Sequence, residues 1–229
     1  MTLVTEEPDD DVPSGGAATE RTRVRRFPKR GHYDRATIHA VIDAGLLCHV
    51  GYVIDGQPYV TPTMHWRVGE HVYWHGSSAS KMLRAQKAAI PVCVTVSLLD
   101  GIVFARSGFN HSINYRCVMA LGRAELVEDE TEKLETLVAF SDRLAPGRWS
   151  DLRPPTKQEM KATTVMRVDL DEAVAKVRSG PPGDDEPDYA LPVWAGVLPL
   201  SMAVGTPVAC PRLDPATPVP ACFESLVTG

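Results

Sequence analysis

The stretch Gly56–Lys81, GQPYVTPTMHWRVGEHVYWHGSSASK, decides the fold of this chain. It holds two runs of β-forming residues, Pro58–Trp66 and His71–His75, joined by a short turn around Gly69. These runs predict a β-hairpin. The serine-rich segment that follows predicts the start of a helix near Lys81, because serine is a favoured N-cap. A hairpin and a helix therefore meet at one place.

The predicted helix start brings together groups that suit a phosphate. Ser77, Ser78 and Lys81 supply two hydroxyls and an ammonium, and a first helical turn adds unpaired N–H groups and a partial positive charge. The neighbouring Tyr, Trp, Met and Thr side chains would line a slot for a flat ring. A phosphate pocket beside an aromatic slot suggests flavin mononucleotide (FMN). The alternative is a capped helix with an exposed lysine and no ligand.

Turn and cap signals divide the rest of the chain into short elements. Asp34 is a good N-cap for a helix that stops at Gly45, and Asp100-Gly101 predicts a turn between two strands. Gly122 predicts a bulge or a close approach. Further strands are predicted over 46–54, 91–98, 102–105, 116–127, 163–170 and 173–177, and further helices near 81–87 and over 130–144.

Six or seven strands with closely spaced turns predict a mainly β fold with inserted helices. An antiparallel barrel, closed or nearly closed, fits this pattern better than a parallel sheet. The chain has no GxGxxG and no GxxxxGK[ST] motif, which removes the usual arguments for a Rossmann domain or a P-loop. We expect a disordered leader over 1–21, the barrel domain over 22–204 and an extended, proline-rich tail over 205–229.

The composition sets limits on the class of protein. A chain of 229 residues with 44% hydrophobic residues fits one globular domain, and its net charge of −5 argues against general nucleic-acid binding. No apolar run approaches the ~18 residues of a membrane span, and the first residues do not resemble a secretion signal. The five cysteines form no CxxC pair, which predicts buried free thiols in a reducing cytoplasm.

Two clusters of charged or titratable residues leave alternatives open. His65, His71 and His75 lie close in sequence, but no carboxylate or cysteine completes a set of ligands, so we expect no metal. If Trp66 pairs with His71, His65 and His75 lie on opposite faces. A basic cluster is either a solvated arm or a clamp on an anionic ligand or an acidic neighbouring subunit; it consists of Arg21, Arg23, Arg25, Arg26, Lys29 and Arg30.

Taken together, these and further motifs resemble the pyridoxamine-phosphate-oxidase-like, FMN-binding split-barrel proteins. The resemblance extends from about Val24 to Leu200, lies closest to the flavin-nucleotide-binding branch and includes the related nitroimidazole reductases. The motifs that carry it are Arg25-Arg26, Arg30-Gly31, Pro62-Thr63-Met64-His65, Tyr73-Trp74-His75-Gly76 with Lys81, Asn114-Tyr115-Arg116, Arg148-Trp149, Arg153-Pro154-Pro155-Thr156, Lys176-Val177-Arg178 and Trp194-Ala195-Gly196-Val197. The Arg-rich substrate pattern of pyridoxamine-phosphate oxidase itself is missing.

The resemblance implies a split β-barrel, a homodimer and FMN in the groove between protomers. Arg116 would fork onto phosphate oxygens, or instead form an ion pair. Backbone groups of Pro62–His65 would meet the polar edge of the flavin ring, and His65 would be either a proton donor or a structural histidine. The full set of candidate cofactor-binding residues is Pro62, Thr63, Met64, His65, His75, Ser77, Ser78, Lys81, Asn114, Tyr115, Arg116, Lys176, Arg178 and Trp194.

Three functions are compatible with such a site. The first is an FMN-dependent oxidoreductase that passes electrons from NADH, NADPH or a similar donor to a small organic acceptor or oxygen. The second is a flavin-binding carrier or sensor without turnover. The third is a split-barrel protein whose groove holds haem.

Overall fold

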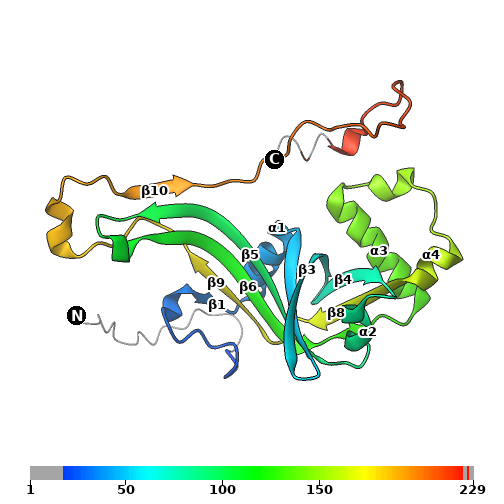
Figure 1. The fold of residues 1–229 in the computed structure, drawn as a ribbon, viewed down its shortest axis with the longest axis horizontal. Coiled ribbons are helices and arrows are strands. Elements are labelled where there is room, and N and C mark those ends of the chain that lie inside the picture. Colours follow the sequence, from blue (N-terminus) through cyan, green and yellow to red (C-terminus); the bar gives the residue numbers. More distant parts are fainter. Residues whose placement is uncertain (1–17, 224–225, 227–229) are drawn as a thin grey trace.

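A computed structural model describes residues 18–223 and residue 226 as one antiparallel sheet with helices packed against it (Figure 1). Three of its strands are short; the full set is β1 (Gly31–His32), β2 (Leu47–Ile54), β3 (Gln57–Val68), β4 (His71–Ser77), β5 (Pro91–Phe104), β6 (Ser112–Arg123), β7 (Glu125–Leu126), β8 (Thr163–Asp169), β9 (Ala173–Arg178) and β10 (Gly196–Pro199). The α-helices are α1 (Arg35–Ala44), α2 (Lys81–Gln86), α3 (Glu130–Leu144) and α4 (Lys157–Ala162).

The strands follow the order β1-β9-β6-β5-β2-β3-β4-β8-β7, and β10 pairs with β5. The two ends of this order are not hydrogen-bonded to each other, so the barrel is split rather than closed. The predicted mainly β, antiparallel fold is confirmed. Only β1 and β10 lack a counterpart among the predicted strands.

Strand alternation separates a core from an outer face. In β2, Cys48, Val50 and Tyr52 are buried, whereas Leu47 and Val53 are half exposed or more. The buried side chains join those of α1, such as Ile38 and Ile42, in the main hydrophobic core. The side-chain period of two therefore directs every second residue of β2 into the barrel.

Helix α1 begins and ends where the sequence predicts. The Asp34 carboxylate accepts a hydrogen bond from the Thr37 backbone N–H at 2.8 Å and caps the helix. At its other end a Cβ on Gly45 would lie 2.4 Å from Val96 Cγ1, so only glycine lets α1 close against β5. Gly122 is a close-approach point as predicted, since a Cβ there would lie 2.6 Å from Val168 Cγ2.

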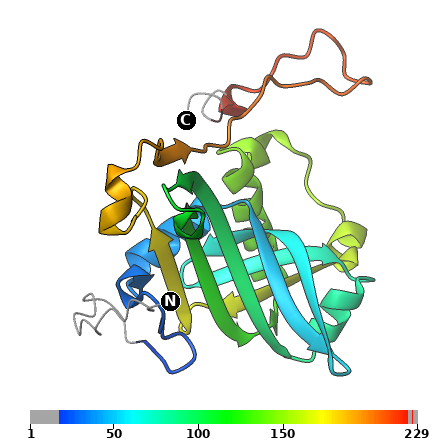
Figure 2. The same cartoon turned by 60° about the vertical axis from the view of Figure 1, so that its left-hand side comes forward.

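Strands β5 and β6 form a long arm that extends beyond the barrel, with β10 along one side of it (Figures 1 and 2). The predicted turn at Asp100-Gly101 is wrong. The chain continues through it as one strand, and the register shifts between Leu99 and Gly101 as in a β-bulge. The arm is therefore one continuous ribbon whose tip lies at residues 105–111.

Helix α3 covers the outer side of β3 and β4 near their shared turn. It spans the predicted residues and is capped by Asp129, whose carboxylate accepts from the Glu132 N–H at 2.7 Å. Under it lies a second apolar cluster that contains Trp66, Tyr73 and Val165.

The ends of the chain carry little regular structure. Residues 1–17 of the predicted leader lie outside the described residues, as do 224–225 and 227–229 of the predicted tail. Between 200 and 220 the tail has no helix or strand, and it loops away from the barrel and back through two turns (Figure 2). None of the helices in the described part of the chain is long and apolar enough to cross a membrane.

Candidate functional site

The predicted site residues lie in two groups on the sheet. One group lies on β3, at the end of β4 and at the start of α2, and the other on β6, on β9 and before β10. Strands β2 and β5 separate β3 from β6. Three strand spacings amount to about 14 Å, so one protomer does not bring the two groups together around one small ligand.

The predicted phosphate group lies on the turn between β4 and α2. Ser80, which the sequence analysis did not single out, caps α2 through its hydroxyl. The Ser78 N–H donates to the Ala162 carbonyl at 2.8 Å, and the Ala79 N–H donates to Ser77 Oγ at 3.2 Å. The backbone N–H groups of Ser78 and Ala79 therefore already have acceptors. The serine hydroxyls and the Lys81 ammonium are the groups that remain to bind an anion.

The Lys81 ammonium lies beside Tyr59 of β3. Its Nζ donates to the Tyr59 hydroxyl at 3.2 Å and stands 4.8 Å from the centre of that ring. Lys81 is exposed, and none of the described carboxylates forms an ion pair with it. An exposed cation held over an aromatic ring is well placed to meet an anionic group.

Strand β3 sends its predicted residues to opposite faces. Pro62 pairs with His49 and Met64 with Leu47, so both face outward, whereas Thr63 pairs with the buried Cys48. His65 points into the core and is 1% exposed.

His65 is a structural side chain in this arrangement. Its Nε2 lies 3.0 Å from the carbonyl oxygen of Ile42, at the end of α1, which Arg143 Nη2 also contacts. Burial holds the pKa of His65 below its ordinary value. A ring enclosed in this way has no path to a ligand on the surface, which argues against a role for His65 as a proton donor.

His75 lies under α3 rather than beside a groove. Its ring packs 4.8 Å from that of Phe140 and 5.5 Å from that of Trp66, measured between centroids. Burial lowers the pKa of His75, so the neutral ring is favoured. His65 pairs in register with Trp74, and His75 therefore lies on the opposite face from His65. Trp66 pairs with Tyr73, two residues from the His71 pairing considered in the sequence analysis, and a shift of two leaves the two histidines on opposite faces.

The Arg116 guanidinium, predicted to bind phosphate, is paired with a carboxylate of its own chain. Its guanidinium donates through Nε and Nη2 to the two Asp100 carboxylate oxygens, at 2.9 and 2.7 Å. The ion-pair alternative is therefore the one found, and both strong donor positions of the fork are occupied. In the register of the two strands Arg116 lies opposite Leu98, and Asp100 follows two residues later on β5, at the bulge.

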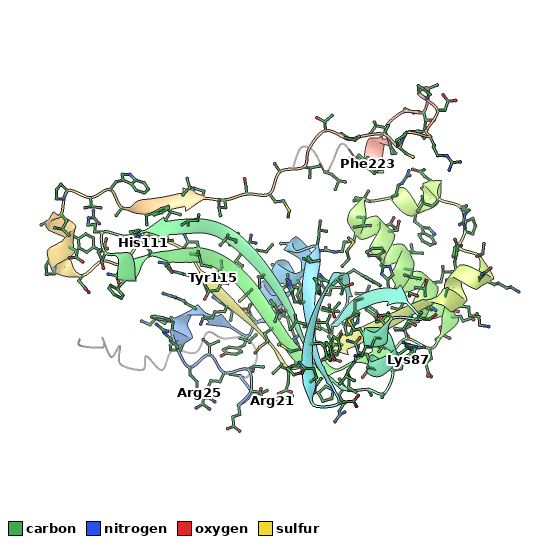
Figure 3. All side chains as sticks on the ribbon, in the orientation of Figure 1. Arg21, Arg25, Lys87, His111, Tyr115 and Phe223 are labelled. Atoms are coloured by element: carbon green, nitrogen blue, oxygen red, sulfur yellow. The ribbon has the colours of Figure 1, made fainter. Side chains whose placement is uncertain are left out.

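The other residues of the second group lie along the arm. Asn114 donates to the Gly180 carbonyl at 3.1 Å and accepts from Arg178. Tyr115 faces outward opposite Leu99, and Lys176 pairs with Cys117 in register. Trp194 is 70% exposed near the tip. Figure 3 shows Tyr115 on the arm and His111 at its tip.

The basic cluster before β1 binds partly to its own chain. Arg21 pairs with Glu172, and the guanidinium carbons of Arg26 and Arg30 lie 5.1 and 4.0 Å from the Phe27 ring centre. These contacts favour a solvated arm, and no ligand is needed to explain them.

The outer face of β2, β3, β5 and β6 carries exposed apolar side chains that the sequence analysis missed. Five of them are between 44% and 67% exposed, namely Leu47, Val53, Val60, Leu99 and Ile113. A shallow depression of about 290 Å³ on this face is lined by Leu99, Ile113, Tyr115 and Cys117. Apolar residues on both faces of β2 were the available signal, because a strand with one solvated face would carry polar residues at every second position. This outer apolar face comprises Leu47, His49, Val53, Val60, Pro62, Met64, Thr95, Leu99, Ile113, Cys117 and Met119.

Comparison with known proteins places these features in context. The family model of pyridoxamine 5'-phosphate oxidase matches residues 34–177. The structure of the flavocytochrome Anf3 from Azotobacter vinelandii is 48% identical, with a TM-score of 0.88, over 92% of this chain and 98% of that one. The FAD and heme binding protein from Mycobacterium smegmatis is 34% identical, with a TM-score of 0.84, over 86% of this chain and 97% of that one.

A more distant match shows the fold alone. It is a protein described as a 5-nitroimidazole antibiotic resistance protein from Bacteroides thetaiotaomicron, 23% identical over 64% of this chain and 86% of that one, with a TM-score of 0.54. The search of curated proteins gave no match.

Proposed function

The chain belongs to the pyridoxamine 5'-phosphate oxidase family, and from this membership we propose that it is a flavocytochrome that binds both a flavin and a haem. The observation that carries the proposal is the 48% identity with flavocytochrome Anf3 over 92% of this chain. The FAD and heme binding protein from Mycobacterium smegmatis supports the same pairing of cofactors. We accordingly propose FAD in place of the FMN expected from the sequence.

The β4–α2 turn fits the phosphate end of a flavin nucleotide. Lys81 is a cation without a carboxylate partner among the described ion pairs, and Ser77 and Ser78 add hydroxyls beside it. Pro62 and Met64 face outward on the adjacent strand, where an apolar ring face would pack. We propose that these residues bind and orient the flavin.

The outer apolar face supports a homodimer. Exposed apolar side chains of this size in one patch mark an interaction site in soluble proteins. A second copy on this face would exclude water from it. It would also bring a β6–β9 group, with Tyr115 and Lys176, towards the β3–β4–α2 group of its partner. This accounts for a site whose two halves lie about 14 Å apart in one protomer.

The chemistry of the proposed function belongs to the cofactors. When bound, a flavin exchanges a hydride or single electrons and a haem exchanges single electrons, so the pair connects a two-electron donor to one-electron steps. We propose NADH or NADPH as the donor and oxygen or a small organic compound as the acceptor. The side chains described above need only bind, orient and exclude water, and no acid or base is assigned among them.

The spectrum of the purified protein tests this proposal directly. We expect a haem Soret band together with flavin absorbance. The flavin extracted from the protein should have the mass of FAD rather than that of FMN. Colourless protein that binds neither added FAD nor added haemin would refute it. Anaerobic mixing with NADH or NADPH then distinguishes a redox enzyme from a carrier or sensor, because an enzyme should cycle faster than free flavin does.

A further inference from the structure

A haem site needs an apolar surface for the ring and an axial side chain for the iron, most often histidine, cysteine, methionine or tyrosine. The chain has seven histidines, all within the described residues. Their contacts can therefore be compared one by one. This comparison rests on the proposed function, because only that function calls for a haem.

Three histidines are held by oxygen atoms of their own chain. His65 Nε2 contacts the Ile42 carbonyl inside the core. His39 Nε2 lies 3.2 Å from Glu70, and His71 Nε2 lies 3.5 Å from Asp169. In each case the nitrogen that would ligate iron already has a polar neighbour.

His111 has the wrong tautomer for ligation. Its Nδ1 accepts a hydrogen bond from the Ala105 backbone N–H at 3.0 Å. A neutral ring that accepts at Nδ1 carries its proton on Nε2, and a protonated nitrogen cannot ligate a metal. His111 would have to break this bond first.

His32 and His75 lie away from the outer apolar face. His32 pairs with Ala175, which is fully buried, so the two side chains share the core side of the sheet. His75 packs among the aromatic rings under α3. Nδ1 of His75 is buried without a hydrogen-bond partner, as is Nδ1 of His65, but the described part of the chain shows no hydrogen bond at Nε2 of His75 either, which makes it the strongest rival.

His49 is the remaining histidine, and its position differs from all the others. It lies at the middle of β2, exposed on the outer apolar face, opposite Pro62 on one side and Thr95 on the other. No hydrogen bond, ion pair or ring contact of its imidazole occurs within the described part of the chain. The backbone carbonyl of His49 accepts from Thr95 Oγ1 at 3.4 Å, and the ring takes no part in that bond.

Small side chains leave room beside His49. Gly51 follows it on the same face, and a Cβ added there would meet nothing closer than 3.5 Å. Cys93 and Thr95 face the same side on β5. Bulkier residues such as Met64 and Met119 lie to either side of this strip. A flat apolar ring fits over such a strip more readily than over a ridge of large side chains.

The cysteines of this face are poor competitors for iron. Burial raises the pKa of both Cys93 and Cys117 above the ordinary value of a thiol. The thiolate is the form that ligates a metal, and here the protonated thiol is favoured. No CxxCH motif occurs in the sequence, so covalent attachment of haem is not expected.

We infer that His49 is an axial ligand of a non-covalently bound haem whose ring lies against the outer face of β2 and β5. This assigns a haem-binding role to a residue that the flavin site does not use. It also explains why a titratable side chain stands without a polar partner on an apolar surface.

The test compares variants of the full-length protein expressed with a haem precursor. His49→Ala should lower the haem content and the apparent affinity for haemin by at least about tenfold, because even residues that only support a metal ligand change affinity about 10–100-fold. Flavin content should stay near that of the wild type, which also reports on folding. Imidazole added to His49→Gly should restore the ligand field seen by absorbance and electron paramagnetic resonance.

The controls separate this inference from the proposed function. His111→Ala should bind haem as the wild type does. If His75→Ala lost its haem while His49→Ala kept a wild-type haem content, the assignment of His49 would be overturned and the flavocytochrome proposal would stand. An electron paramagnetic resonance spectrum of the wild type that is typical of a sulfur ligand would have the same meaning. A wild type that contains flavin but never takes up haem would overturn both.

Discussion

The charge of Lys81 should decide how tightly the flavin phosphate is held. Replacing it with methionine keeps an unbranched apolar stem and removes the ammonium that stands over the Tyr59 ring. A hydrogen bond to a charged group is worth about 1.5–3 kcal/mol, and we take the lower figure of about 1.5 kcal/mol because Lys81 is exposed and water screens its charge. The dissociation constant of the flavin should rise roughly twelvefold.

The assay is fluorescence titration of apoprotein with FAD at fixed ionic strength. Lys87→Met is the matched control, because this lysine is also exposed and lies at the other end of the same helix. Arg116→Ala should leave the affinity within about twofold, as is usual for substitutions away from a site, since Asp100 already holds that guanidinium. Equal affinity for Lys81→Met and wild type, or a larger loss in Arg116→Ala, would refute this location of the phosphate.

Three further perturbations test the fold and the outer face. Gly45→Ala should lower the free energy of unfolding by about 1–3 kcal/mol in urea titrations, since its Cβ would lie 2.4 Å from Val96 Cγ1. Burial keeps the pKa of His65 below 6.5, so the unfolded state binds more protons below that pH. The urea midpoint should therefore fall as the pH drops below about 6.5, and His65→Gln should weaken this dependence. Val60→Asp should convert the proposed dimer to a monomer in sedimentation equilibrium, because Val60 is 67% exposed on the outer apolar face.

The substitutions at Gly45, His65 and Val60 are each checked by a control variant or by a result that would contradict the prediction. Gly108→Ala should change stability little, because nothing lies within 4 Å of the added atom. An unaltered pH profile in His65→Gln would mean that the ring is not protonated on unfolding in this range. Val208→Asp, on a residue of the tail that is 94% exposed, should remain dimeric, and a dimer in Val60→Asp would place the subunit contact elsewhere.

The mainly β fold was predictable because its signals are local. The β-forming runs of β2 and β3, the cap at Asp34 and the helical spacing of α3 each depend on residues a few positions apart. The β4–α2 turn was predictable for the same reason. The helix predicted to start near Lys81 begins at that residue, with Ser80 as its N-cap.

The failures concern residues whose partners lie far away in sequence. Asp100-Gly101 reads as a turn by composition, yet pairing with β6 carries the strand straight through it as a bulge. Asp100 also becomes the carboxylate partner of Arg116, which lies 16 residues away in the chain, and no local pattern contains that information. Likewise, the position of His65 in its strand shows which neighbouring residues share its face. It does not show that α1 and Arg143 enclose the ring.

The sequence alone determined the period of each element, its caps and the grouping of side chains by face, since these follow from backbone geometry over one or two turns. Only the tertiary structure decided which face became the core, which cations were already neutralised and which histidine was left without a partner. Those outcomes depend on contacts between strands and helices that lie far apart in the chain, whose energies no local window of sequence contains.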